Sequence, residues 1–130
     1  MQFSLLVLSA PGASQSPATA LRFAKTLLAE GHSLYRVFFF YDGVLNGSAL
    51  SITPQDESDI PASWRQLAND HGVDLVLCVS SALKKGILSQ TEADRHDKPA
   101  MSVAESFDIS GLGQLIDAAL VSDRLIEFGG

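Results

Sequence analysis

The sequence predicts a single three-layer α/β/α domain with a mainly parallel, five-stranded sheet. Short apolar runs alternate along the chain with amphipathic segments, which is the pattern of strands joined by helical crossovers. The runs at 3–8, 34–40 and 73–79 are continuous rather than alternating, as expected for strands that are covered on both faces. With 130 residues, the chain has the length of one domain and can form a hydrophobic core without disulfides.

The first predicted strand, 3–8, is followed by a loop that runs from Ser9 to Ser16 and then by a helix. We expect Ser16 to be the N-cap of this helix and Pro17 its first residue, because serine is a favoured cap and proline fits the first turn. Apolar residues then recur at helical spacing, and Gly31 ends the helix. This segment therefore connects the first strand to the second.

The second predicted strand, 34–40, is rich in aromatic residues and ends in a turn at 41–43. The polar stretch 46–60 is predicted to be a long loop or a short helix at the rim of the sheet. Pro61 begins a second helix, which Gly72 ends. The helical face that recurs along it consists of Trp64, Leu67, Ala68 and His71.

The third predicted strand, 73–79, carries the only cysteine of the chain, Cys78, near its carboxyl end. A short helix at 80–86 and a second, polar helix at 89–96 follow it.

The last third of the chain is predicted to add two strands and a helix. A fourth strand is predicted at 101–104, and the fifth at 124–128. Ser110 is expected to cap the helix between them. One face of this helix is predicted to consist of Leu112, Leu115, Ile116, Ala119 and Leu120.

The composition excludes several classes of function. The formal net charge is −6, whereas nucleic-acid affinity comes mostly from Lys and Arg that neutralise phosphates. No apolar run approaches the ~18 residues of a membrane helix, and the N-terminus lacks the pattern of a signal peptide. A single cysteine allows no intramolecular disulfide, which fits a reducing compartment. We therefore expect a cytoplasmic protein whose natural partner is a basic protein or peptide.

Cys78 is the main candidate for chemistry, because reactive groups of open parallel sheets lie at the carboxyl ends of the strands. A helix that begins at Ser80 or Ser81 directs its free N–H groups toward the sulfur. Lys84 and Lys85 add positive charge nearby. Both effects lower the pKa of a thiol and favour the nucleophilic thiolate. The alternative is that Cys78 simply fills the core, as free cysteines commonly do.

Two other segments are candidate binding sites. The loop from Ser9 to Ser16 precedes a helix N-terminus, where phosphate can bind, but it matches no nucleotide-binding motif and has the alternative of an ordinary turn. Asp56, Glu57 and Asp59 are either a solvated acidic rim or a docking patch for a basic carrier.

The histidines do not form a metal site. His32, His71 and His96 lie far apart in the sequence, without metal-ligand spacing, so we expect neither a metal nor a cofactor. His71 is expected to interact with the end of its helix. Tyr41, just beyond the second strand, is a candidate for lining a pocket around the cysteine.

The segment around Cys78 resembles the cysteine segment of the TusD/DsrE family of sulfurtransferases. In that family a single cysteine is followed by a turn of small residues, an alanine, a basic pair and a glycine, and the segment 77–86 has this order. Other matches surround it in the same order along nearly the whole chain. They are 38–44, 66–67, 71–73, 110–115, 123–124 and Phe128.

The resemblance implies a DsrEFH-like fold over 1–130 and one functional residue, Cys78, which carries sulfur as a persulfide. It implies assembly with TusB-like and TusC-like subunits into a heterohexamer. It also implies a TusA-like sulfur donor, a TusE-like acceptor and, as the end product, 2-thiouridine in the wobble position of certain tRNAs. Direct binding of tRNA or of a membrane by this chain is not expected.

Three alternatives stay open. DsrE-like relatives serve sulfur oxidation together with DsrF and DsrH, and the shared cysteine does not distinguish the two pathways. The chain could also be a non-catalytic scaffold subunit of a hetero-oligomer whose partner carries the working cysteine. A small-ligand or nucleotide module that uses the loop from Ser9 to Ser16 is the third.

Overall fold

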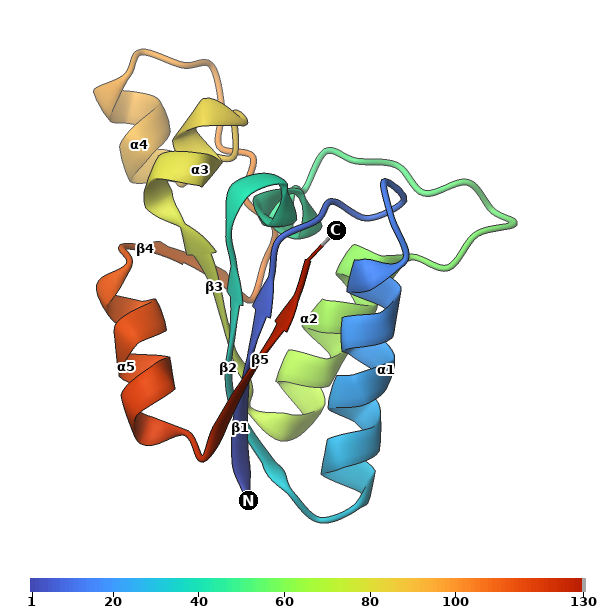
Figure 1. The fold of residues 1–130 in the computed structure, drawn as a ribbon. Coiled ribbons are helices and arrows are strands. Elements are labelled where there is room, and N and C mark those ends of the chain that lie inside the picture. The colour runs from blue at the N-terminus through green and yellow to red at the C-terminus, as the bar shows by residue number, and fades with distance from the viewer. Residues whose placement is uncertain (130) are drawn as a thin grey trace.

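The computed structural model describes residues 1–129 and contains a five-stranded sheet with helices on both faces (Figure 1). The strands are β1 (Gln2–Val7), β2 (Ser33–Phe39), β3 (Asp74–Cys78), β4 (Phe107–Ser110) and β5 (Arg124–Phe128). Their order in the sheet is β4-β3-β2-β1-β5, and each neighbouring pair is parallel. The predicted fold class is therefore confirmed.

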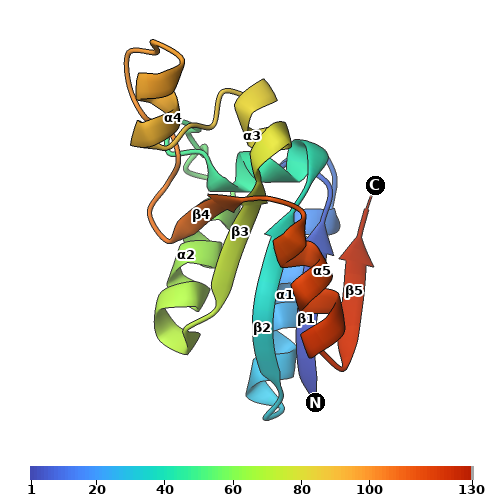
Figure 2. The same ribbon diagram turned by 90° about the vertical axis from the view of Figure 1, so that its left-hand side faces the viewer.

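The helices form two layers and a group at one end of the sheet. The first layer contains α1 (Ser16–Ala29) and α2 (Ile60–His71), and α5 (Gly113–Val121) covers the opposite face (Figure 1 and Figure 2). Two short helices, α3 (Val79–Lys84) and α4 (Gln90–Arg95), lie beyond the carboxyl ends of the strands (Figure 1). They correspond to the helices predicted at 80–86 and 89–96. The 3-10 helix η1 (Tyr41–Gly47) lies at the same end.

The main core lies between the sheet and the pair α1 and α2. Trp64 of α2 is fully buried, and its ring meets that of Phe39 edge to face with a centroid distance of 5.5 Å. The Phe39 ring also contacts that of Phe107 at 5.6 Å. Each such aromatic pair contributes about 0.5–1.5 kcal/mol beyond the burial of its area. These contacts hold β2, β4 and α2 together.

Two glycines allow η1 to lie against the ends of β1 and β3. A Cβ atom on Gly43 would lie 2.2 Å from the carbonyl oxygen of Val7, and one on Gly47 would lie 2.5 Å from a methyl group of Leu77. A larger residue at either position would push η1 away from the sheet. Glycine therefore keeps η1 beside the carboxyl end of β3, where Cys78 lies.

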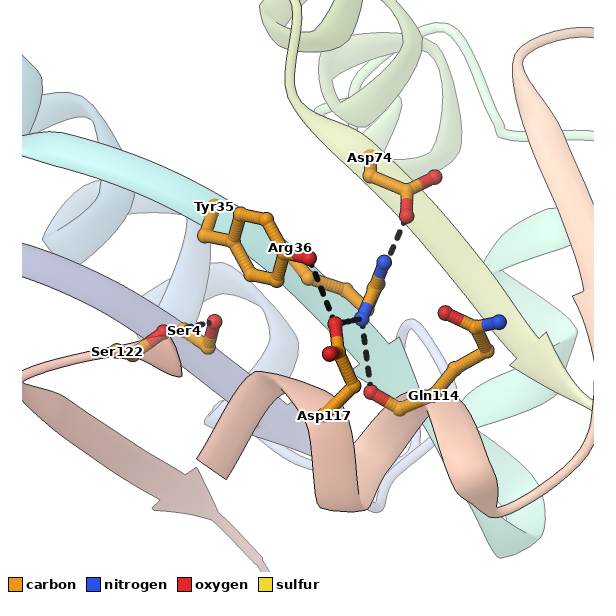
Figure 3. Close-up of polar contacts among 7 residues, drawn as sticks. All are labelled: Ser4, Tyr35, Arg36, Asp74, Gln114, Asp117 and Ser122. Atoms are coloured by element: carbon orange, nitrogen blue, oxygen red, sulfur yellow. Dashed lines mark hydrogen bonds and ion pairs between the residues drawn. The ribbon is translucent and has the colours of Figure 1, made fainter. Parts of the chain in front are cut away.

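The opposite face of the sheet carries an ion-pair network around the buried Arg36, beneath α5 (Figure 3). Arg36 Nε lies 2.7 Å from Asp74 Oδ2, and Arg36 Nη1 lies 3.0 Å from Asp117 Oδ2. The same Nη1 donates to the carbonyl oxygen of Gln114 at 2.8 Å, and the Tyr35 hydroxyl donates to Asp117 at 2.6 Å. The register of β2 against β1 skips Tyr35, so this residue and Arg36 both reach α5. The network ties β2, β3 and α5 together.

The predicted strand at 101–104 is wrong. In this segment Val103 forms an isolated antiparallel bridge, and the fourth strand is β4 instead. β4 is a four-residue edge strand with an exposed Asp108, so it lacks the continuous apolar run that marks the other strands. Ser110, which the sequence predicts as a helix cap, is the last residue of β4 and pairs with Cys78.

The last helix, α5, has the predicted spacing but turns its predicted apolar face mostly to solvent. The exposed fraction is 46% at Leu112, 61% at Ile116 and 80% at Leu120. The inward positions are taken by the buried Ala118, by the partly buried Leu115 and by the two residues that bond Arg36. Periodicity therefore located the helix correctly, whereas the buried cation decided which side faces the sheet.

The ends of the first two helices differ slightly from the prediction. Gln15 rather than Ser16 is the N-cap of α1, without a side-chain hydrogen bond, and Pro17 is the second helical residue rather than the first. Asp59 caps α2, because its carboxylate accepts an N–H of the first turn at 3.0 Å. The predicted turn at 41–43 is the start of η1, and the stretch between η1 and α2 is a loop.

We expect Arg36→Met to destabilise the fold, because it removes the cation between two carboxylates and keeps most of the apolar stem. The free energy of unfolding is expected to fall by about 2–3 kcal/mol, less than for a fully buried pair because Asp74 and Asp117 keep contact with solvent. Urea denaturation followed by Trp64 fluorescence measures the change. Arg22→Met on the exposed side of α1 is the control, and an equal loss in both variants would contradict a special role for Arg36.

The same network predicts a pH dependence of stability. The hydrogen bonds from Tyr35 and then from Arg36 hold the pKa of Asp117 below its ordinary value. The unfolded chain therefore takes up this proton first, so the stabilisation is present above the ordinary aspartate pKa of about 3.9 and is lost as the pH falls through the lower folded value. Asp117→Asn removes this component, and we expect its unfolding free energy to depend less on pH below about pH 4. Unchanged acid sensitivity in Asp117→Asn would contradict the assignment.

Candidate functional site

Cys78 is the last residue of β3 and the N-cap of α3. It therefore lies at the carboxyl end of the third strand, as predicted. Alternate residues of a strand share a face, so Cys78 lies on the same face of the sheet as Asp74, the partner of Arg36. Its side chain is buried, with an exposed fraction of 1%. The sulfur is therefore shielded from bulk solvent in the isolated chain.

The serines that follow Cys78 in α3 affect the ionisation of its sulfur. The Ser80 hydroxyl oxygen lies 3.5 Å from Cys78 Sγ. Burial by itself raises the pKa of the Cys78 thiol, but hydrogen bonds from the hydroxyls and backbone amides of Ser80 and Ser81 lower it, and the net pKa is below that of a free cysteine. The sulfur is therefore more readily ionised than an ordinary buried thiol, which is what a nucleophile needs.

Contacts between η1 and α3 hold these serines in place. The Tyr41 amide donates to the Ser81 hydroxyl oxygen at 3.1 Å, and Asp42 forms an ion pair with Lys85 at 2.7 Å. Tyr41 has a positive φ of 50°, and its ring stacks on that of Phe40 with a centroid distance of 4.2 Å. These contacts join the segment that follows β2 to the segment that follows β3.

A cavity of about 390 Å³ opens between η1 and α3. Its lining residues are Phe40, Tyr41, Asp42, Ser80, Ser81, Lys84 and Lys85. Tyr41 thus lines the same cavity as Ser80, which contacts the sulfur, and both lysines line it too. Cys78 is not among the lining residues, but Ser80, which contacts the sulfur, is.

The loop from Ser9 to Ser16 uses its polar groups within the protein. The Ser14 hydroxyl accepts the Ser16 amide at 3.2 Å, and the Ser16 hydroxyl donates to the carbonyl oxygen of Gly129. The Ser9 carbonyl accepts from the buried Asn46 side chain at 3.1 Å. This arrangement fits the ordinary turn better than a loop whose hydroxyls are free to bind phosphate.

The structure does not bring the histidines together. His32 Nδ1 lies 3.0 Å from the N-terminal amino group, and His96 Nε2 lies 3.3 Å from Glu92, while His71 is in the last turn of α2. Within residues 1–129, no group of three or more His, Cys, Asp or Glu side chains is placed to hold a metal ion. Over the same residues, no helix has the length and apolar character needed to cross a membrane.

The three acidic residues Asp56, Glu57 and Asp59 have different surroundings in the structure. Asp59 caps α2, and Glu57 lines a second cavity of about 420 Å³ between the loop that follows η1 and the loop that follows β1. Asp56 and Glu57 are exposed, in agreement with a solvated rim.

Sequence reasoning located Cys78 but missed the role of the Tyr41 backbone and the pairing of Asp42 with Lys85. The one signal in the sequence was that Tyr41 and Asp42 come just after the predicted second strand. In the structure this strand, β2, pairs with β3, which carries Cys78. The hydroxyls at 80 and 81 are visible in the sequence, yet their contact with the sulfur depends on the path of the chain after Cys78.

Comparison with known proteins agrees with this geometry. The chain is 43% identical to DsrE of Allochromatium vinosum over 129 residues, which is 99% of each chain. It is also 43% identical to the sulfurtransferase TusD homolog of Pseudomonas aeruginosa over 132 residues, covering 100% of this chain and 98% of the relative. The sulfurtransferase TusD of Cronobacter sakazakii is 42% identical over 128 residues, covering 98% of this chain and 100% of the relative.

The fold also has a close counterpart among solved structures. The crystal structure of the YchN protein from E. coli superposes with a TM-score of 0.79 and 22% identity, over 98% of this chain and 99% of that one. Residues 1–128 match the DsrE/DsrF-like family. On this match, and on full-length relatives at 42–43% identity, the chain belongs to the DsrE/DsrF-like family as a homologue of TusD and DsrE.

Proposed function

We propose that this chain is a sulfurtransferase subunit that carries sulfur as a persulfide on Cys78. The observation that supports this most directly is the contact at 3.5 Å between the Ser80 hydroxyl oxygen and Cys78 Sγ at the carboxyl end of β3. In this setting the pKa of the thiol lies below its ordinary value, because hydrogen bonds outweigh the effect of burial. The relatives named as sulfurtransferases TusD support the same activity. The chemistry requires one nucleophilic sulfur, stabilisation of its anion, and access for a partner's sulfur.

The transfer consists of two balanced exchange steps. The Cys78 thiolate attacks the outer sulfur of a donor persulfide, the sulfur–sulfur bond of the donor breaks, and the donor leaves as a thiolate. Cys78 then holds the sulfane sulfur until an acceptor thiolate attacks it and releases the Cys78 thiolate. Sulfur moves at the same oxidation level throughout, so neither step needs an external oxidant, a metal or a cofactor.

The burial of Cys78 sets a condition on both steps. With 1% of the residue exposed, the sulfur meets a donor only after a side chain or a neighbouring segment moves aside. A partner subunit or the donor itself can provide this movement. The scaffold alternative predicts instead that Cys78 stays unreactive in the assembled complex as well.

The exposed face of α5 supports assembly with other subunits. Leu112, Ile116 and Leu120 follow one another at helical spacing with exposed fractions of 46%, 61% and 80%. Contiguous exposed apolar residues mark interaction surfaces in soluble proteins. Partners related to TusB and TusC, in a heterohexamer, are the assembly proposed for a homologue of TusD.

The pathway we propose is formation of 2-thiouridine at the tRNA wobble position, with a TusA-like donor and a TusE-like acceptor. A net charge of −6 supports a role in which another component contacts the tRNA. Sulfur oxidation is the second candidate, because DsrE of Allochromatium vinosum is as similar to this chain as the TusD homolog of Pseudomonas aeruginosa. Deletion of the gene separates the two: loss of 2-thiouridine from total tRNA supports thiolation, and unchanged tRNA contradicts it.

We expect a reducible gain of one sulfur atom on wild-type protein after exposure to a persulfidated carrier protein, and none on Cys78→Ser. The serine hydroxyl is nearly the same size as the thiol, so the fold is retained while the nucleophile is lost. Intact-mass spectrometry before and after reductant measures the adduct. Circular dichroism of Cys78→Ser is the control for folding.

The carrier role is rejected if the adduct also forms on folded Cys78→Ser. An adduct on neither protein, with the reconstituted hetero-oligomer also unloaded, would favour the scaffold alternative. An adduct that forms only in the reconstituted complex supports a carrier whose sulfur is uncovered by its partners.

A further inference from the structure

The two lysines that follow Cys78 line the same cavity but differ in their charge partners. Lys85 Nζ lies 2.7 Å from Asp42 Oδ1, so a carboxylate that lines the cavity as well neutralises its charge. Lys84 also lines the cavity and is exposed, and among residues 1–129 it forms no ion pair. The charge of Lys84 is therefore the one that the other side chains of the cavity wall leave unbalanced.

We propose that Lys84 is the counter-ion for the partner's sulfur anion during transfer at Cys78, whereas Lys85 and Asp42 form a structural ion pair that links α3 to η1. This inference rests on the proposed function and deepens it. It names the group that favours an anionic sulfur in the cavity, and it identifies the incoming ligand by its chemistry, as a thiolate.

The cavity lies next to the reacting sulfur. Ser80 lines it, and the Ser80 hydroxyl oxygen lies 3.5 Å from Cys78 Sγ, so this side chain connects the cavity wall to the sulfur. The volume of about 390 Å³ is ample for a methylene group and two sulfur atoms, since one water molecule takes up about 30 Å³ in the liquid. A partner's cysteine that reaches Cys78 through this cavity also comes close to Lys84.

Both steps of the transfer place a negative charge on the partner's sulfur. In loading, the Cys78 thiolate attacks the outer sulfur of the donor persulfide, the sulfur–sulfur bond of the donor breaks, and the donor leaves as a thiolate. In unloading, the acceptor thiolate attacks the same sulfur atom, its bond to Cys78 Sγ breaks, and the electron pair returns to Cys78. The partner's thiolate is the leaving group of the first step and the nucleophile of the second. One cation in the cavity stabilises it in both.

The overall charge of the chain makes a local cation important. A net charge of −6 repels an anion that approaches the protein. Lys85 offsets this repulsion little, because Asp42 lies 2.7 Å from it. Lys84 is the last residue of α3 and carries a flexible side chain with a compact charge. The alternative is that Lys84 only interacts with the carboxyl end of its helix, and this alternative predicts no preference for anions in the cavity.

Alkylation of Cys78 by two reagents of different charge measures this preference. Iodoacetate is an anion, and iodoacetamide is neutral and of similar size. The same thiolate attacks both after the same opening of the site, so the ratio of the two rates depends on neither the pKa nor the burial of the thiol. For Lys84→Gln we expect the ratio of the iodoacetate rate to the iodoacetamide rate to fall by about two- to fivefold at low ionic strength, and by less in high salt. Mass spectrometry of the peptide that carries Cys78 gives both rates.

Three further variants separate the charge of Lys84 from other effects. Lys84→Arg keeps the charge and is expected to keep the wild-type ratio. Lys98→Gln removes the same charge from the wall of a different cavity, so we expect no change. Asp42→Asn removes the carboxylate that neutralises Lys85 and is expected to raise the ratio. Thermal unfolding shows that each variant is folded before its ratio is compared.

An unchanged ratio in folded Lys84→Gln overturns the counter-ion role, and so does an equal fall in Lys98→Gln. A ratio that does not rise in Asp42→Asn overturns the neutralisation of Lys85. If Cys78 of the isolated chain reacts with neither reagent, the ratio is measured on the reconstituted hetero-oligomer, and no reaction there overturns the inference as well.

The alkylation ratio involves no sulfur transfer, so it is independent of the carrier role. The expected fall in Lys84→Gln, together with no persulfide adduct in the complex, rejects the proposed function alone. Normal persulfide loading together with an unchanged ratio rejects this inference alone.

Discussion

Parallel pairing of β2 with β3 is the constraint on which the site depends. The register pairs Phe39 with Leu77, so both strands reach the same edge of the sheet together. The next residues of each chain segment therefore emerge side by side, and Tyr41 after β2 can donate to Ser81 after β3. An antiparallel pairing would place the two segments at opposite edges. The hydrogen-bond ladder thus aligns two segments that lie about forty residues apart in the sequence.

The buried charge of Arg36 determines how α5 packs on the sheet. Arg36 and Phe38 lie on one face of β2, and Asp74, Val76 and Cys78 lie on one face of β3. α5 covers the Arg36 end of this face and supplies Asp117 as a second carboxylate. The residues that bond the buried guanidinium therefore occupy inward positions of α5, and Leu112, Ile116 and Leu120 are left exposed. The polar network and the exposed apolar helix face have one cause.

Local patterns in the sequence were sufficient for most of the fold, because continuous apolar runs and helix-ending glycines are local signals. They failed where a long-range contact decided the outcome. β4 is recognisable only once Phe107 is placed against Phe39 and Leu75, and the orientation of α5 depends on Arg36, which lies about eighty residues earlier in the sequence. The position of Cys78 was predictable from its strand. Its contacts with Ser80 and the link from Ser81 to Tyr41 were not, since they depend on backbone angles after each strand.

The surroundings of Cys78 combine two effects that oppose each other in the pKa of the thiol. Burial alone favours the protonated, unreactive form, and hydrogen-bond donors alone, on an exposed cysteine, would leave a bound sulfur open to any thiol in solution. Together they allow a sulfur that is both ionisable and shielded. A carrier needs this combination, because it must accept sulfur readily and yet release it only to a partner that uncovers it. A cysteine that merely filled the core would need the burial but not the donors, and the donors are what the path of the chain from Cys78 to Ser81 supplies.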